Sequence, residues 1–324
     1  MDLIYLNRED FAKWDEFVQN SPQGSIFSKS WYLDALGVDY KILAVIQKGS
    51  IKAGIVLAEN EINTFSNPML DKYLGFLFIK EDGNYQKQIS NRYQYMNILA
   101  NEIKDITSFD YYFHPNFTNW IPLYWKGFAQ QTRYTYIIDN SRSLEEIESR
   151  FHHNIKRNIK NAIKNGVEVR REIPFEDLWY VVNKTFLRQG SKAPFNKDRL
   201  KRFINDLMNR GSFISFGAYN DRNEPIAVLG FVYEEKSSYL LLNGVDIDRE
   251  IRGANALIVK ESIRYFYNIC QKYDFEGSMI EGIEQFYRRF GGELIPYYRV
   301  WNDNIFNYLK TIAKKYYKRF KYGR

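Results

Sequence analysis

The order of the expected helices and strands limits the fold most strongly, because a similar order occurs twice in the 324 residues. In the first half, strands at 40–47 and 51–59 are joined by Lys48-Gly49-Ser50, and glycine in so short a turn is typical of a hairpin. The second half contains a meander with strands at 213–219, 226–234 and 239–245. Helices precede the paired strands in both halves, and a helix with further strands follows them. This pattern predicts an α+β fold used twice, with mixed, mostly antiparallel sheets flanked by helices.

The length of the chain favours two domains, since one hydrophobic core rarely organises more than about 250–300 residues. We expect an N-terminal domain at 1–143 and a C-terminal domain at 144–303. Apolar residues recur at helical spacing in 304–324, and we expect this segment to form a helix that packs on the N-terminal domain. The alternative for the segment is contact with an anionic membrane surface.

The net charge of +7 comes entirely from this last segment. Its cations are Lys310, Lys314, Lys315, Lys318, Arg319, Lys321 and Arg324. In the rest of the chain, 39 Lys and Arg residues balance 39 Asp and Glu residues. A DNA-binding surface is therefore not expected.

Several common kinds of site are excluded by the residue types. One cysteine and three histidines cannot form an intrachain disulfide or a structural zinc site, so no metal is expected. Cys270 continues an apolar helical pattern and is expected at a buried helix position. The first residues lack a signal peptide, and no apolar run reaches about 18 residues, which predicts a soluble, cytoplasmic protein. Contact with the inner face of the membrane remains an option.

Two stretches of the second half have the residue types of a transfer site. A loop with Arg249 and Arg252 leads into a helix start at Gly253, which suits the binding of a phosphate or pyrophosphate. The alternative is an ordinary strand-to-helix loop, which would have the same sequence pattern. Further on, Asp274 and Glu276 alternate with aromatic residues and share one strand face. They could accept a proton from an ammonium group. Alternatively, one of these two carboxylates caps a loop and the other forms an ion pair with an arginine.

A basic helix at 151–165 is the third candidate. Its apolar residues form one stripe, so its cations lie elsewhere on the helix surface: Lys156, Arg157, Lys160 and Lys164. They form either a solvated face or a wall for an anionic substrate.

Six segments resemble the FemAB-like branch of the GNAT (N-acyltransferase) superfamily, whose members carry two GNAT-type domains in one chain. The segments occur in the family's order: FSKSWYLDAL (27–36), IPLYWKGFAQQTRYTY (121–136), NIKRNIKNAIKNGVEV (154–169), TFLRQG (185–190), GANAL (253–257) and DFEGSMIEGIEQFYRRFGG (274–292). The resemblance implies tandem GNAT domains and an enzyme that moves an acyl group from an activated ester or thioester to an amine. It implies direct attack by the amine, in a cleft bounded by both domains, without a covalent enzyme intermediate or a tightly bound cofactor.

The resemblance also assigns roles to individual residues. The strand 239–245 would diverge from its neighbour, and an N–H near Asn243 or Gly244 would polarise the acyl carbonyl. The donor phosphates would meet Arg252, Gly253, Ala254 and Asn255. For the mechanism, we ourselves predict that Glu276 or Asp274 accepts the ammonium proton and that Tyr287 protonates the leaving group. Substrate contacts are expected from Lys156, Arg157, Gln189, Ser278, Glu281 and Arg288.

The donor remains open between two classes. Glu250 and Asn255 occupy the first and last places of the acyl-CoA fingerprint Q/R-x-x-G-x-G/A, which is therefore not intact. We expect an acyl-CoA-like donor and a small-molecule or envelope-precursor amine as acceptor, in cell-envelope or polysaccharide synthesis. One alternative is aminoacyl-tRNA-dependent transfer to a peptidoglycan precursor, with tRNA bound by the basic helix. The other is a non-catalytic module at the membrane surface.

Overall fold

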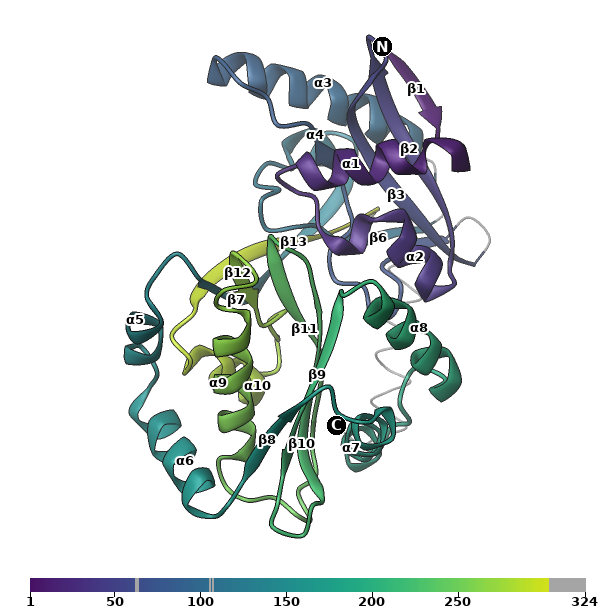
Figure 1. The fold of residues 1–324 in the computed structure, drawn as a ribbon. Coiled ribbons are helices and arrows are strands. Elements are labelled where there is room, and N and C mark those ends of the chain that lie inside the picture. The colour runs from purple at the N-terminus through teal and green to yellow at the C-terminus, as the bar shows by residue number, and fades with distance from the viewer. Residues whose placement is uncertain (62–63, 105, 107, 303–324) are drawn as a thin grey trace. The chain divides into compact units, whose positions relative to one another are not determined.

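A computed structural model describes residues 1–61, 64–104, 106 and 108–302 (Figure 1). They form two compact units, of which the first contains residues 1–133 together with 297–302 and the second is Tyr134–Pro296. The boundaries expected at 143/144 and 303/304 thus differ from those observed. The second boundary differs because the last strand, Glu293–Asn302, returns to the first unit. The expected basic helix at 304–324, its packing and its lipid contact lie outside the described residues.

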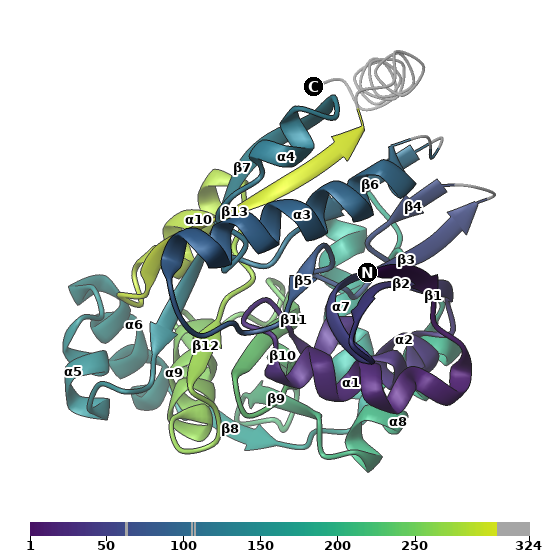
Figure 2. The ribbon, with the colours of Figure 1, turned by 90° about the horizontal axis from the view of Figure 1, so that it is seen from above.

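The N-terminal unit is built around one sheet. Its strands are β1 (Asp2–Tyr5), β2 (Asp39–Gln47), β3 (Ser50–Glu61), β4 (Thr64–Ser66), β5 (Leu77–Phe78), β6 (Ser108–Tyr112) and the last part of β13 (Glu293–Asn302). Its helices are α1 (Phe11–Asn20), α2 (Ser30–Leu36), α3 (Tyr85–Ile103) and α4 (Ile121–Tyr124), with 3-10 turns at Arg8–Asp10 and Ile26–Ser28. The strand order is β1-β2-β3-β4-β6-β13, and β5 pairs with β3. The helix α3 runs beside α4 (Figure 2).

The hairpin expected around Lys48 is confirmed. Gln47 of β2 pairs directly with Ser50 of β3, so the loop contains only Lys48 and Gly49. Both residues have positive φ, 52° and 73°, as a two-residue turn of this kind requires.

The C-terminal unit repeats the α+β arrangement. Its strands are β7 (Phe128–Asp139, which begins in the N-terminal unit), β8 (Glu168–Arg171), β9 (Phe213–Tyr219), β10 (Pro225–Tyr233), β11 (Ser237–Val245) and β12 (Lys272–Asp274). Its helices are α5 (Leu144–Ser149), α6 (His153–Lys164), α7 (Phe175–Arg188), α8 (Lys197–Asn209), α9 (Ala254–Phe266) and α10 (Glu281–Arg288). The strand order is β7-β12-β11-β10-β9-β8. Only β11 and β12 pair in parallel among the described strands of this unit.

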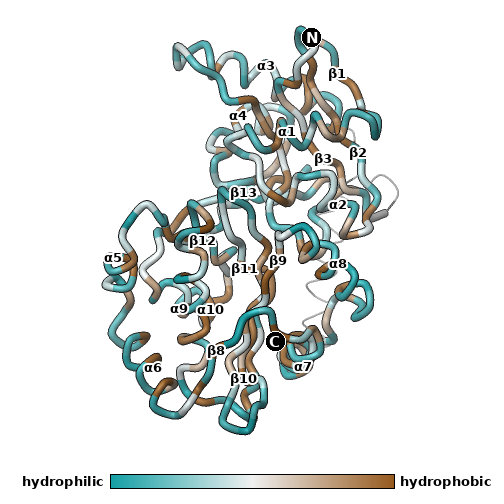
Figure 3. The backbone as a smooth tube through the Cα atoms, viewed as in Figure 1, coloured by the Kyte–Doolittle hydropathy of each residue, from teal (hydrophilic) through white to brown (hydrophobic). Residues whose placement is uncertain are grey.

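Helices cover both faces of the C-terminal sheet. In Figure 1, α7 lies on one side of β10 and β11, and α9 lies on the other. Every residue of β9 is buried, and Figure 3 shows hydrophobic central strands beneath helices with hydrophilic outer faces. A strand that is buried on both faces has a nearly continuous apolar sequence, which explains why apolar and polar residues do not strictly alternate in β9 and β10.

One local expectation needs correction. The apolar pattern places Cys270 on a helix, but α9 ends at Phe266, and a turn leads into β12 at Lys272. Cys270 therefore lies in this turn instead of on the helix, although it is buried as expected. Burial, with a smaller contribution from the charge of Glu234, raises the pKa of its thiol to about 12, so a nucleophilic role has no support.

Candidate active site

The strands β11 and β12 separate at the centre of the C-terminal sheet. They pair over only three positions, from Ser237 opposite Lys272 to Tyr239 opposite Asp274. Beyond this point β12 ends, whereas β11 continues to Val245 and stays paired with β10. The divergence expected for the strand at 239–245 is therefore present from residue 240 onward.

A β-bulge lies at the start of the separated part of β11. Gly230 pairs with Leu242 and Phe231 pairs with Leu240, which leaves Leu241 as the extra residue. A bulge of this kind increases the local twist and changes the direction of the strand. It thus contributes to turning β11 away from β12.

The N–H groups of β11 can be assigned to the two sides of the strand. The Asp246 N–H donates to the Ile226 carbonyl of β10, at 2.9 Å, whereas the Val245 N–H donates to the Thr185 hydroxyl of α7, at 3.1 Å. Because successive N–H groups alternate along a strand, the Asn243 N–H points away from β10, as that of Val245 does. Of the two predicted N–H groups, that of Asn243 therefore faces the separated side and that of Gly244 faces β10.

Gly244 has a packing role where α7 crosses β11. A Cβ at this position would lie 3.1 Å from the Val181 carbonyl and from the Cα of Val182. This distance is tighter than an ordinary van der Waals contact, so a larger residue would push α7 outward.

The carboxylate of Asp274 holds the loop that follows β12. Its side chain is 2% exposed, and one oxygen accepts hydrogen bonds from the Thr135 hydroxyl at 2.5 Å and from the Glu276 N–H at 2.7 Å. Glu276 has a left-handed backbone, with φ of 57°, and Gly277 follows with φ of 61°. Strained backbone of this kind persists only where surrounding contacts hold it, and it is frequent at functional sites. Asp274 thus has the loop-capping role that was the alternative to catalysis.

The hydroxyl of Tyr287 connects α10 to the separated part of β11. It accepts a hydrogen bond from the Asn243 side-chain amide at 3.3 Å, and the residue is 6% exposed. Burial raises the pKa of Tyr287 to about 12, and the nearby charge of Glu276 acts in the same direction. The structure thus brings together Asn243, Glu276 and Tyr287, all predicted from the sequence.

The predicted phosphate-binding residues form the start of α9. Gly253 is the N-cap residue with φ of 100°, and no side chain of the described residues caps the helix there. The backbone of Gly253 passes so close to α6 that a Cβ would lie 2.0 Å from the Asn158 carbonyl oxygen. The Asn161 side chain also donates to the Arg252 carbonyl at 2.7 Å. The side chain of Arg252 is exposed, and the Asn255 side-chain oxygen is buried without a hydrogen-bond partner in the described structure.

The other predicted substrate contacts make local interactions at the surface. On one side, the Lys156 ammonium donates to the Ser149 carbonyl. Near α10, the Ser278 hydroxyl accepts from the Ile280 N–H, and the Glu281 carboxylate accepts from the Gln285 amide. The Arg288 guanidinium lies 3.6 Å from the Glu284 carboxylate. Arg157 on α6 and Gln189 at the end of α7 are exposed. Their substrate role stays a prediction.

Two supporting residues were missed by the sequence interpretation. Thr185 bonds both backbone groups of Val245, and the ammonium of its neighbour Lys184 lies 2.6 Å from the fully buried carboxylate of Asp246. Burial acts to raise the pKa of Asp246, but the Lys184 ammonium and the Asp248 N–H outweigh it, so the pKa lies below its ordinary value. These contacts fix the end of β11 against α7. The TFLRQG segment contains Thr185, but spacing alone gave no reason to select it.

Metal and membrane features can be stated for the described part of the chain. There, no group of three or more His, Cys, Asp or Glu side chains is arranged to hold a metal ion. Among the helices of the same residues, none combines the length and apolar character needed to cross a bilayer.

The chain matches no protein-family model and no curated protein sequence. Solved structures do match over nearly its whole length. FemX is 13% identical with a TM-score of 0.66, covering 92% of this chain and 97% of its own. A tandem GNAT protein from the clavulanic acid biosynthesis pathway is 10% identical with a TM-score of 0.58, covering 93% and 97%. The L-PGS protein of Bacillus licheniformis is 12% identical with a TM-score of 0.55, covering 92% of each chain.

At these identities the likeness concerns the fold. It agrees with the mixed, mostly antiparallel sheets found in both units. The resemblance to tandem GNAT proteins is confirmed at this level, and the chain has the tandem GNAT fold.

Proposed function

We propose that this chain is an N-acyltransferase that moves an acyl group from an acyl-CoA-like donor to an amine. The observation that carries the proposal is the separation of β11 from β12, with the Asn243 N–H and the Tyr287 hydroxyl beside it. The resemblance suggests an amine of an envelope or polysaccharide precursor as the acceptor.

The open side of β11 suits an amide-containing donor. An unpaired strand edge offers N–H and carbonyl groups to an extended ligand, as in strand addition. The Asn243 N–H would donate to the acyl carbonyl oxygen and stabilise the negative charge that develops there. The uncapped start of α9, next to Arg252, would hold the donor phosphates.

The reaction then needs one group that accepts a proton and one that supports the leaving group. The amine attacks the acyl carbon, the new C–N bond forms, and the bond from carbon to the leaving sulfur breaks. Accessibility favours Glu276 as the base, because Glu276 is half-buried, whereas Asp274 is buried and binds Thr135 and the Glu276 N–H. With a pKa of about 12, Tyr287 is a weaker acid than a thiol, at about 8.5. We therefore expect it to donate a hydrogen bond to the thiolate, which finally takes the proton released by the amine.

The test combines binding with turnover. We expect acetyl-CoA or a longer acyl-CoA to bind in calorimetric titration, and Glu276→Gln to lower turnover by about 10²–10⁴-fold if Glu276 is the base. Glu235→Gln, which changes an exposed glutamate of the same unit, is the matched control and should keep wild-type turnover.

Two results would contradict the proposal in different places. If no acyl-CoA produces heat or a thermal shift, the donor class is wrong. If donors bind but Glu276→Gln turns over like the wild type, only the assignment of the base is wrong.

An aminoacyl-tRNA donor is a second candidate, supported by the surface of α6. Its cations Lys156, Arg157, Lys160 and Lys164 are all exposed, and the helix contains no acidic residue. Binding through such a surface releases counterions and must weaken steeply with salt. Filter binding of charged tRNA at rising salt concentration tests this, and affinity that does not change with salt would remove the candidate.

A further inference from the structure

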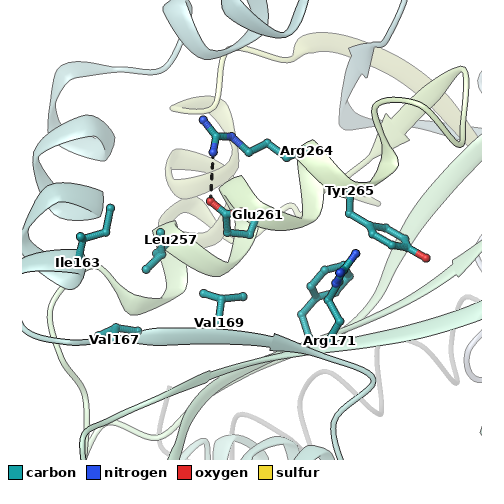
Figure 4. A pocket seen from close by; sticks show the side chains of 9 residues that line it. Ile163, Val167, Val169, Arg171, Leu257, Glu261, Arg264 and Tyr265 are labelled. Carbon is teal, nitrogen blue, oxygen red and sulfur yellow. Dashed lines mark ion pairs between the residues drawn. The ribbon is translucent and has the colours of Figure 1, made fainter.

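A cavity of about 620 Å³ lies in the C-terminal unit between α6, β8 and α9 (Figure 4). Its volume is within the range of small-molecule pockets, about 300–1,000 Å³. None of the residues proposed for catalysis, donor binding or substrate binding lines it.

The cavity follows from the way its three walls are built. Leu257, Glu261 and Arg264 share one face of α9, and Val169 and Arg171 share one face of β8. β8 is the last strand of the sheet. α6 is held to the start of α9, where Gly253 meets Asn158. Space therefore remains between the edge strand and the side of α9.

Apolar residues form part of the inner wall of the cavity. Val167, Phe216 and Leu257 are buried, and Val169 is half-buried. Ile163 stands at the rim on the last turn of α6 with 58% of its surface exposed. Such a wall gains by excluding water in favour of an apolar chain.

Two arginines, Arg171 and Arg264, and one glutamate, Glu261, line the cavity. Arg264 is neutralised by Glu148 at 2.5 Å and lies 3.7 Å from Glu261. Arg171 stacks its guanidinium over the Tyr265 ring, 5.4 Å from the centroid, and forms no ion pair within the described residues. The exposed guanidinium of Arg171 thus lies beside the apolar residues of the lining and forms no ion pair in the described part of the chain. A guanidinium in this state matches a carboxylate through two parallel hydrogen bonds.

We propose that this cavity is a second ligand site, which binds a monocarboxylate with a medium-length alkyl chain. The chain lies against Val167, Val169 and Leu257, and the carboxylate pairs with Arg171. This inference is independent of the proposed acyl transfer, because it uses different residues and needs no turnover.

The experiment titrates the full-length protein with decanoate and with decan-1-ol in a calorimeter, in the presence of saturating coenzyme A. Decanoate should bind, and loss of the charged pair in Arg171→Gln should weaken it by about 10–100-fold. Arg170→Gln is the matched control, because Arg170 is the neighbouring residue on β8 and pairs with Glu168. It should bind decanoate like the wild type.

A second variant and a second readout keep the test decisive. Val169→Phe fills the cavity from β8, and it should abolish binding while circular dichroism shows a folded protein. A photoreactive diazirine analogue of decanoate should label peptides of β8 and α9. Equal affinity for decan-1-ol, unchanged binding by Arg171→Gln, labelling elsewhere, or absence of binding to the wild type would each overturn the proposal.

Discussion

The side-chain amide of Asn243 donates a hydrogen bond to the hydroxyl of Tyr287, at 3.3 Å. This bond joins the open strand β11 to α10 at the place where β12 has ended. It therefore couples the backbone that would hold the acyl carbonyl to the side chain that would meet the leaving group.

Replacement of Tyr287 by phenylalanine removes this hydroxyl and little else. If it stabilises the leaving group, kcat should fall by about 10²-fold with the donor KM unchanged, because the interaction exists only in the transition state. Tyr267→Phe, at a half-buried tyrosine after α9, should leave kcat unchanged.

Because the pKa of Tyr287 is about 12, the wild-type pH profile of kcat should show no loss of activity from ionisation of Tyr287 up to about pH 10. Steady-state kinetics checks both points, and a raised KM with normal kcat would assign Tyr287 to binding alone.

The hydrogen bond from Thr135 to Asp274 should contribute to stability. Thr135→Val leaves the buried carboxylate one donor short and should lower the free energy of unfolding by about 1–3 kcal/mol. Thr132→Val, on the same strand but half-exposed, should change it by less than about 0.5 kcal/mol. Urea denaturation measures both variants. Equal effects would mean that the bond to Asp274 adds nothing particular.

The buried pair of Lys184 and Asp246 should matter more than ion pairs at the surface. Lys184→Met removes the nearer cation of the buried Asp246 carboxylate and leaves Arg249 at 3.8 Å, so it should cost about 1–3 kcal/mol of unfolding free energy. Lys201→Met, which breaks an exposed pair with Glu176, should cost less than about 1 kcal/mol.

The same pair predicts an acid dependence of stability. The pKa of Asp246 is lowered in the folded chain, so its contribution is complete above the unfolded value of about 3.9. It is lost as the pH falls from that value through the lower folded pKa. The difference in unfolding free energy between wild type and Asp246→Asn should therefore shrink below about pH 4. A difference that stays constant down to about pH 2–3 would contradict this assignment.

Two glycines with positive φ allow a direct comparison of backbone strain and crowding. Gly166→Ala should cost about 1–2 kcal/mol, because φ is 71° and nothing lies within 4 Å of the new Cβ. Gly253→Ala should cost clearly more, because its Cβ would meet the Asn158 carbonyl and force α6 from α9. It should also weaken donor binding, whereas Gly166→Ala should not. Thermal unfolding and calorimetry check this, and equal losses would show that the contact at Asn158 is unimportant.

Local sequence was sufficient where local forces decide the structure. The turn at Lys48 and Gly49, the meander of the second half and the glycine start of α9 all depend on neighbouring residues, and all were predicted. The end of α9 was misplaced, because the apolar spacing continues through Cys270 while the chain already turns.

Contacts between distant residues explain what the sequence could not give. β12 is held at its end by Thr135 and Asp274, which are 139 residues apart. Alternation alone could not show that the Asp274 carboxylate would bind the Thr135 hydroxyl and the Glu276 N–H. Likewise, the choice between the N–H groups of Asn243 and Gly244 required the strand register and the bulge at Leu241. The return of β13 to β6 was missed for the same reason.

That return has a consequence for the order in which the protein can form on the ribosome. Arg299, Val300 and Trp301 pair with Tyr112, Tyr111 and Asp110, so β6 lacks its neighbour on this side until residues 299–301 have been synthesised. During translation this bare strand edge is a template for wrong association. Of the two units, the one that emerges first is therefore completed second, and a nascent chain stalled before residue 297 should depend more on chaperones than one that has passed residue 302.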